Sequence, residues 1–368
     1  MALRGKYMTT KTIPANDIKN TYWMMGLGLL AVRIIQGFIY WGGGSRRFIY
    51  APDKLNPEAP HWMAYKFQTA MPGALLGLEH VISFMLQHFW LLYAGVILFS
   101  AAELFAGLFL MLGLFTRISA ILSMLFSVLL MLMFGWQGAT CIDEWTMAAC
   151  NLAMGTTLFL CGSNEYALDN VLLKKKPHLA DSKMFRWCCG SLPIPLPQGS
   201  YKKLALWLLA FVVIFDVGTY SYYRGSVVTP YHHGPVSPTT HHISLTQGKL
   251  MADGRVEFHA YLDAGTPEAP EHIMEAWLKD EKGENLIHWD TAMLSALPKD
   301  HFHNDYAYNQ FKTSRYGIQA IVGSAATITL PAGRIREGAD ILPDGPITLV
   351  LMDMAGHTFS VPLTRESE

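Results

Sequence analysis

One loop of the sequence brings a thiol close to two carboxylates. It spans 135–145 and contains Cys141, Asp143, Glu144 and Trp145. A thiolate is a nucleophile that can enter two-electron chemistry, and neighbouring carboxylates can donate or accept protons. A buried apolar cysteine is the alternative, but the carboxylates and tryptophans beside this thiol favour a catalytic role for Cys141, Asp143 and Glu144.

Two adjacent arginines, Arg46 and Arg47, follow a run of three glycines. Guanidinium groups hold small oxyanions through paired hydrogen bonds, so both arginines are candidate substrate-binding residues. Contact with lipid headgroups is the alternative. The glycines are not a phosphate loop, because no GxxxxGK pattern follows them. Trp145 and His80 complete the candidate substrate-binding set, although lone histidines are more often ordinary surface residues.

Arg33 and Glu103 each stand in the middle of a strongly apolar run. Burying either charge alone in a membrane costs several kcal/mol, so we expect the two side chains to pair with each other across helices. Such a pair either fixes the register of the helices or lies beside a quinone-binding or proton-relay site.

Histidine pairs at 232–233 and 241–242 are conceivable transition-metal ligands by residue type. Their spacing matches no standard zinc pattern, so no metal site is predicted. The sequence also lacks a CxxCH haem motif, a GxGxxG motif and the cysteine spacing of an iron–sulfur cluster. No tightly bound cofactor is therefore predicted.

The elements that position these residues are mostly transmembrane helices. Only 15% of the 368 residues are charged, against about 25% in a soluble domain. Stretches long enough to span a bilayer are Tyr22–Trp41, Trp90–Phe115, Ser119–Phe134 and Lys203–Tyr220, with a shorter fifth candidate at Thr146–Cys161. Polar residues interrupt Gly73–Trp90, which we place at the membrane surface or as a re-entrant segment.

Lysine and arginine are concentrated before the first predicted span and in the loop between the last two. The positive-inside rule then puts the N-terminus in the cytoplasm of a multi-pass inner-membrane protein and the C-terminal domain outside. One outer loop carries Arg46, Arg47, Lys54 and Lys66. Cys141 is left as the unpaired outer thiol, because 188–189 face the reducing cytoplasm and Cys150 and Cys161 are roughly 16 Å apart on one helix.

The C-terminal region is predicted to form an all-β domain. Short alternating runs at Val256–Leu262, Ala276–Leu278, Ala325–Leu330 and Ile347–Asp353 are separated by turn dipeptides, which is typical of a small antiparallel sandwich. We therefore divide the chain into a membrane α-helical bundle at 1–200, a linking transmembrane helix at 201–223 and an extracytoplasmic β domain at 224–368. The net charge of −1 argues against a nucleic-acid partner.

Several segments resemble a known pair of proteins. The N-terminal bundle resembles DoxD, the membrane subunit of thiosulfate:quinone oxidoreductase, and the C-terminal domain resembles its companion subunit, DoxA. The segments that carry the resemblance are 46–55, 113–117 and 135–145 for DoxD, and 235–238, 241–243 and 304–306 for DoxA. The segment Cys141-Ile-Asp-Glu-Trp145 is the most specific, whereas Gly-Leu-Phe-Thr-Arg also suits broader DoxX-like four-helix bundles.

The resemblance implies oxidation of two thiosulfate ions to tetrathionate, with electrons passing to a membrane quinone as substrate. Without a redox-cofactor motif, we hypothesise that the Cys141 thiolate adds to the quinone and that thiosulfate then displaces quinol, leaving a Cys–thiosulfonate intermediate. A second thiosulfate attacks this intermediate and releases tetrathionate. Arg46 and Arg47 would lower the thiol pKa, and Asp143 or Glu144 would handle protons. Assembly as a homodimer or with a terminal oxidase is a further expectation.

Two other functions fit the residues less well. In one, the bundle is a non-catalytic DoxX-like membrane anchor whose outer β domain docks a respiratory or sulfur-metabolism partner. In the other, the chain transports sulfur oxyanions through a polar path at Arg33 and Glu103.

Overall fold

The computed structural model describes residues 15–50, 52–138, 143–163, 165–226, 228–333 and 345–365. Contacts divide the chain into two compact units, each assembled from separate stretches of sequence. The first unit comprises residues 1–45, 100–126 and 150–212, and the second comprises residues 46–99, 127–149 and 213–368. The C-terminal domain therefore shares a unit with part of the helical region.

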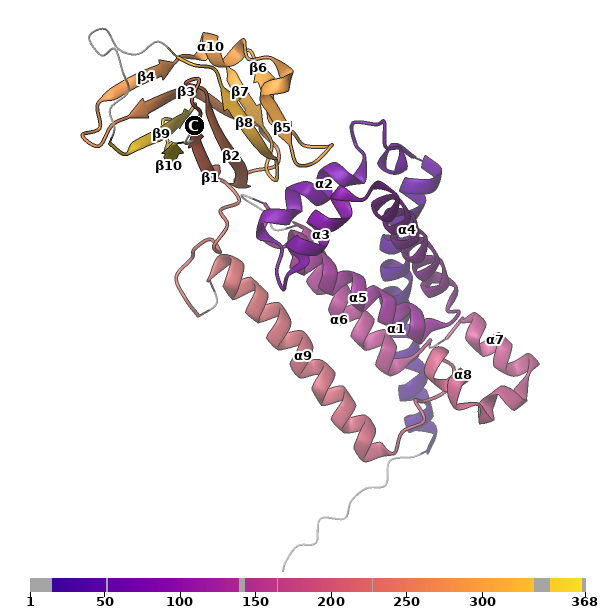
Figure 1. Cartoon of the computed structure of the whole chain (residues 1–368). Helices are drawn as coiled ribbons and strands as arrows, with labels where there is room; N and C mark the ends of the chain where they lie inside the picture. Colours follow the sequence, from indigo (N-terminus) through magenta and orange to yellow (C-terminus); the bar gives the residue numbers. More distant parts are fainter. Residues whose placement is uncertain are drawn as a thin grey trace, which may run out of the picture. The chain divides into compact units, whose positions relative to one another are not determined.

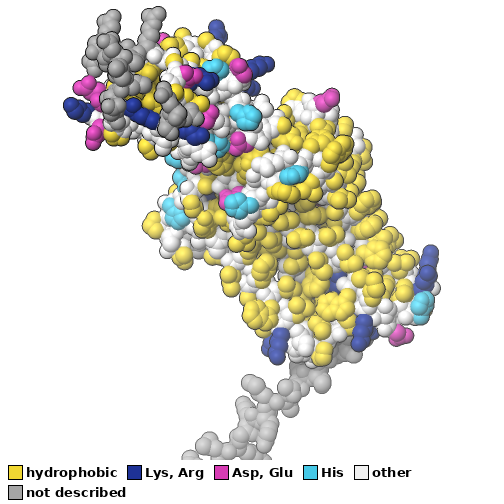
Figure 2. Space-filling view, in the orientation of Figure 1, with side chains coloured by type: hydrophobic (Ala, Val, Ile, Leu, Met, Phe, Trp, Pro, Cys, Tyr) yellow, Lys and Arg dark blue, Asp and Glu magenta, His cyan; other side chains and the backbone are white. Residues whose placement is uncertain are grey.

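Among the described residues, four helices are long and apolar enough to cross a membrane. They are α1 (Ala15–Ser45), α4 (Phe89–Leu112), α5 (Thr116–Phe134) and α9 (Gln198–Arg224). Many of their large apolar side chains are exposed, including Phe38, Leu98, Ile121 and Trp207, and apolar side chains cover much of the helical surface in Figure 2. Such a surface suits lipid rather than water. The four predicted spans of this multi-pass membrane protein are thus confirmed.

The predicted fifth span lies within α6 (Asp143–Cys161). Glu144, Asn151 and several threonines lower the hydropathy of α6, so it is not among the four apolar helices. The segment predicted at the membrane surface contains α3 (Leu78–Gln87), which follows α2 (Met63–Ala70) and the 3₁₀ turn η3 (Met71–Gly73). Three short helices connect α6 to α9: α7 (Leu168–Lys175), η4 (Pro177–Asp181) and α8 (Lys183–Cys188).

Within the first unit, glycines allow α1 and α4 to approach closely. A Cβ atom added at Gly107 would overlap the backbone nitrogen of Trp41, and one added at Gly37 would lie 2.7 Å from the backbone nitrogen of Met111. Small residues at helix contacts provide this proximity inside membranes, where packing replaces hydrophobic burial as the driving force.

The described part of the C-terminal domain forms a nearly closed sheet of ten strands (Figure 1). The strand order is β5-β8-β2-β1-β10-β9-β3-β7-β6, and β4 also pairs with β3. The strands are β1 (His242–Leu250), β2 (Val256–Ala264), β3 (Glu271–Lys279), β4 (Asn285–Trp289), β5 (Phe302–Asn304), β6 (Lys312–Ser314), β7 (Gly317–Ala320), β8 (Ala325–Leu330), β9 (Ile347–Asp353) and β10 (Thr358–Arg365). Two short helical turns, α10 (Thr291–Ser295) and η5 (Lys299–His301), lie between β4 and β5.

Alternation of buried and partly exposed side chains explains the strands. It is complete along β2, where Val256, Phe258, Ala260 and Leu262 are fully buried. The predicted β class is confirmed, but the expectation of a purely antiparallel arrangement is wrong at one pair. Strands β1 and β10, the first and last along the chain, are neighbours in the middle of the strand order, and they run parallel where Lys249 pairs with Thr364 and Leu250 with Arg365.

Within the second unit, Gln68 of α2 joins the helical region to the β domain. Its buried amide nitrogen donates to the carbonyl oxygens of Asn309 at 2.8 Å and Gly323 at 2.9 Å. Its Oε1 accepts from the backbone nitrogen of Asn309 at 2.8 Å, and the Asn309 side chain donates to the carbonyl oxygen of Tyr65 at 3.0 Å. These reciprocal bonds fix the register between α2 and the loop before β6, since any shift would leave buried polar groups unpaired.

A buried ion pair joins the residue before β1 to the first residue of β3 in the β domain. His241 Nδ1 lies 2.7 Å from Glu271 Oε2, and the other ring nitrogen faces the carbonyl oxygen of Thr266 at 3.1 Å. The charged imidazolium, with an N–H donor on each ring nitrogen, satisfies both acceptors. Burial lowers the pKa of His241, but the hydrogen bond and charge of Glu271 outweigh burial and raise that pKa above its usual value.

Replacing Gln68 with Ala should weaken the junction between α2 and the β domain. Several buried backbone groups would lose their partners, so we expect the free energy of unfolding to fall by about 2–4 kcal/mol. The measurement is the thermal midpoint and trypsin sensitivity of the detergent-purified protein. Gln87→Ala, an exposed position on α3, is the matched control. Equal midpoints for both variants would contradict this role for Gln68.

The His241–Glu271 pair should make stability depend on pH. Because the folded pKa of His241 is raised, the contribution of the pair is complete below the unfolded pKa of about 6.5 and is lost as pH rises through the folded pKa. We therefore expect Glu271→Gln to lower the thermal midpoint most in acid and least in alkali. Glu275→Gln, which removes the partner of the more exposed His288, is the control. A pH-independent difference between Glu271→Gln and wild type would rule out this linkage.

Candidate functional site

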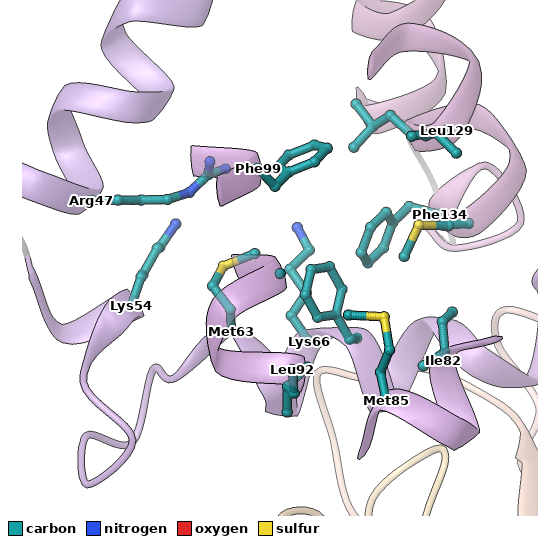
Figure 3. Close-up of a pocket in the computed structure, with 14 residues that line it drawn as sticks. Arg47, Lys54, Met63, Lys66, Ile82, Met85, Leu92, Phe99, Leu129 and Phe134 are labelled. Atoms are coloured by element: carbon teal, nitrogen blue, oxygen red, sulfur yellow. The ribbon is translucent and has the colours of Figure 1, made fainter. Parts of the chain in front are cut away.

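A largely apolar cavity of about 240 Å³ lies within the second unit. Its walls come from α2, α3, η1 (Arg46–Tyr50), η2 (Pro52–Leu55) and the parts of α4 and α5 that belong to this unit. Met63, Ile82, Met85, Leu92 and Phe134 contribute apolar surface (Figure 3). Cavities with apolar walls and a few polar groups are typical binding sites for small molecules.

Three cationic side chains line this cavity: Arg47, Lys54 and Lys66. Figure 3 shows their nitrogen-bearing ends directed toward the space between Met63 and Phe99. Cations beside an apolar wall favour a ligand that combines an apolar body with negatively polarised oxygen atoms. We call this arrangement the cationic cavity.

Local backbone geometry separates the two predicted arginines. Helix α1 runs directly into the π-helical turn η1, a widened helical turn that often occurs at functional sites. Arg47 is partly buried and lines the cationic cavity, whereas Arg46 is exposed and is not among the lining residues. The structure therefore places only one of the two at this site.

Lys66 connects the cavity to a predicted catalytic residue. Its Nζ lies 3.1 Å from Glu144 Oε1 and 5.1 Å from the centre of the Phe134 ring. The side chains of Lys66 and Glu144 are 48% and 33% exposed, so water screens this ion pair and its chief effect is positional. It holds the carboxylate of Glu144 at the edge of the cationic cavity.

The predicted thiol, Cys141, lies outside the described residues, as does the side chain of Asp143. The backbone that enters this segment is held by Arg224, whose guanidinium donates to the carbonyl oxygens of Gln137 and Gly138.

Trp145 has a different neighbourhood from the one predicted. Its Nε1 donates to Thr219 Oγ1 at 2.9 Å, and its ring centre lies 5.1 Å from that of Tyr220. It thus packs against α9 and does not line the cationic cavity.

His80 is exposed, with Nε2 3.4 Å from Glu79 Oε1. It lines a separate hollow of about 390 Å³ that includes Ser83 and Tyr306, whose hydroxyl oxygens are 2.8 Å apart. The structure therefore does not bring His80 together with Arg47.

The predicted Arg33–Glu103 pair is wrong. Arg33 is 1% exposed and donates to the backbone carbonyl oxygens of Ser163, Glu165 and Tyr166. Glu103 lies beside Gly43, where an added Cβ would overlap Glu103 Oε1. Positions 33 and 43 are about 15 Å apart along α1. Carbonyl dipoles therefore stabilise the buried guanidinium in place of the expected carboxylate.

Sequence reasoning missed the role of Asp169 in the same unit. This fully buried carboxylate accepts from the backbone nitrogens of Phe115 and Gly190, each at 2.8 Å, and from the Thr116 hydroxyl at 2.9 Å. Arg117, 1% exposed, donates to four backbone carbonyl oxygens nearby. The Gly-Leu-Phe-Thr-Arg segment is thus a structural junction for the loops around it.

Sequence reasoning also missed Lys54 and Lys66 as site residues. It counted them only as charges of an outer loop. Lys54 reaches the cavity from the 3₁₀ turn η2 and Lys66 reaches it from α2. No local sequence pattern predicts that these two side chains line the same cavity.

Two family models match the chain. The model for the TQO small subunit DoxD matches residues 29–196, and the model for the TQO small subunit DoxA matches residues 223–361. TQO denotes thiosulfate:quinone oxidoreductase. The first match contains the helices that form the cationic cavity, and the second contains the β domain. The chain therefore belongs to the DoxD and DoxA families, whose two domains it joins in a single polypeptide.

Proposed function

We propose that this protein oxidises thiosulfate to tetrathionate and transfers the electrons to a membrane quinone. The observation that carries the proposal is the cationic cavity, which lies in a membrane protein of the TQO small-subunit families. The overall reaction balances as two thiosulfate ions, one quinone and two protons giving one tetrathionate ion and one quinol.

The cationic cavity suits a quinone head group. Its apolar walls can enclose the ring, while Arg47, Lys54 and Lys66 can donate hydrogen bonds to the ring oxygens. Negative charge develops on those oxygens as the quinone accepts electrons, and fixed cations stabilise that charge. The long tail of a membrane quinone would extend toward lipid.

The thiol of Cys141 is our proposed carrier of the electron pair. Its thiolate adds to the quinone ring, which takes the electron pair and one proton. The outer sulfur of thiosulfate then attacks Sγ, breaks the Sγ–ring bond and leaves Sγ–S–SO₃⁻, while the ring takes a second proton and departs as quinol. A second thiosulfate attacks the sulfur next to Sγ, releasing tetrathionate and regenerating the thiolate.

Protons for the quinone would come from Glu144, held at the cavity edge by Lys66, or from the neighbouring Asp143. We also propose that the N-terminus is cytoplasmic and that the β domain lies outside, since basic residues dominate the loops assigned to the inner side. Arg33 is already engaged with loop carbonyls, so we give it a structural role.

Arg47→Gln should impair the use of quinone. Loss of one charge-assisted hydrogen bond to a ring oxygen should lower kcat/KM for a soluble quinone analogue about tenfold. Arg46→Gln removes the same charge one residue away but outside the cavity, and it should retain wild-type kinetics. Thiosulfate-dependent quinone reduction by the detergent-purified protein is the assay. An equal loss of kcat/KM in both variants would indicate an effect of net charge alone and would argue against a quinone in this cavity.

Cys141→Ser should abolish turnover while preserving the fold. A hydroxyl cannot form the sulfur–sulfur intermediate, so we expect thiosulfate-dependent quinone reduction to fall at least roughly a hundredfold. Cys150→Ser, which removes an exposed free thiol on α6, serves as the control. Full activity of Cys141→Ser would reject the thiol mechanism, and an inactive wild type would reject the proposed function and favour the anchor role.

A further inference from the structure

A second, more polar hollow of about 700 Å³ adjoins Lys66, again within the second unit. Lys66 lines both this hollow and the cationic cavity. On the helical side the hollow is bounded by Tyr65, Thr69, Gln137 and Glu144. Its walls are mixed and hydrogen-bonding, in contrast to the apolar walls of the cationic cavity.

The β domain supplies the rest of the lining. Tyr308, Asn309 and Gln310 come from the loop before β6, Lys312 from β6, and Gln319 from β7. Lys312 and Gln319 are register partners in the β6–β7 pair, so their side chains stand next to each other on the sheet. The hollow thus carries one lysine from each side, Lys66 and Lys312.

The balance of charge in the hollow favours an anion. Two lysines line it against one carboxylate, that of Glu144, which is already paired with Lys66. The side chains of Tyr65, Tyr308 and Gln319 can donate further hydrogen bonds. The amide nitrogens of Gln137, Asn309 and Gln310 already donate to oxygens of the protein. A small dianion with several oxygen atoms matches this set better than an apolar or cationic ligand.

The backbone segments that carry the two lysines are held in register with each other. Lys66 precedes Gln68 by two residues on α2, and the Gln68 side chain forms hydrogen bonds with Asn309. Asn309 lies in the loop that leads into Lys312. The Gln68–Asn309 bonds therefore hold α2 and the loop before β6 beside one hollow, which one lysine from the helical side and one from the β domain line. Such preorganisation lowers the cost of binding, because the protein need not rearrange.

We propose that this hollow binds the sulfur oxyanion, with Lys312 of the DoxA-type domain and Lys66 of the DoxD-type domain contacting its oxygens. The inference rests on the proposed function and deepens it. It makes the β domain part of the substrate site, and it places the oxyanion next to the cationic cavity through their shared lysine.

The test is equilibrium binding of ³⁵S-labelled thiosulfate to the full-length, detergent-purified protein without quinone. We expect Lys312→Gln to weaken binding about tenfold, because one charge-assisted contact is lost. Lys312→Arg keeps the charge and should retain most of the affinity. Lys299→Gln removes an exposed lysine elsewhere on the β domain and should bind like wild type. Thermal midpoints verify that all variants are folded.

Steady-state kinetics give a second readout. Lys312→Gln should raise the KM for thiosulfate about tenfold and leave the KM for the quinone analogue unchanged. Unchanged thiosulfate binding in Lys312→Gln, equal weakening in Lys299→Gln, or no binding by wild type would overturn the inference. Wild type that binds thiosulfate through Lys312 but reduces no quinone would reject the proposed function while supporting the oxyanion site.

Discussion

The second unit depends on the reciprocal hydrogen bonds between Gln68 and Asn309. Both side chains are buried, and their bonds join residues that are 241 positions apart in the chain. Because an unpaired buried amide is costly, the pairing admits only one register between α2 and the loop before β6. The polar hollow, and the placement of Lys66 opposite Lys312, follow from that register.

In the first unit, buried charged side chains are stabilised by backbone groups rather than by the oppositely charged side chains that we expected from the sequence. We expected Arg33 to be neutralised by Glu103, but backbone carbonyl oxygens surround its guanidinium. Arg117 likewise donates to backbone carbonyl oxygens, and Asp169 accepts hydrogen bonds from backbone N–H groups of the connecting loops. These charged side chains form hydrogen bonds with backbone N–H and C=O groups at the ends of helices. Without such partners, those backbone groups would be buried in an apolar bundle with their hydrogen bonds unmade.

The site itself was only partly predictable. Arg47 and Glu144 were singled out by residue type and sequence neighbourhood, and the structure places both at the cationic cavity or its edge. Arg46 is at the same sequence locus yet exposed, because successive helical residues point in different directions. Lys66 was missed because nothing local distinguishes it from any other lysine of an outer loop.

The sequence by itself determined the membrane helices, the β class of the C-terminal domain and the two families, because apolar runs, alternation and short motifs are local properties of the chain. Only the tertiary structure decided which charges meet. Arg47, Lys54 and Lys66 line one cavity and Lys66 and Lys312 line another because of turns, register and helix packing over long sequence separations. Each of those features is set by the whole fold rather than by neighbouring residues.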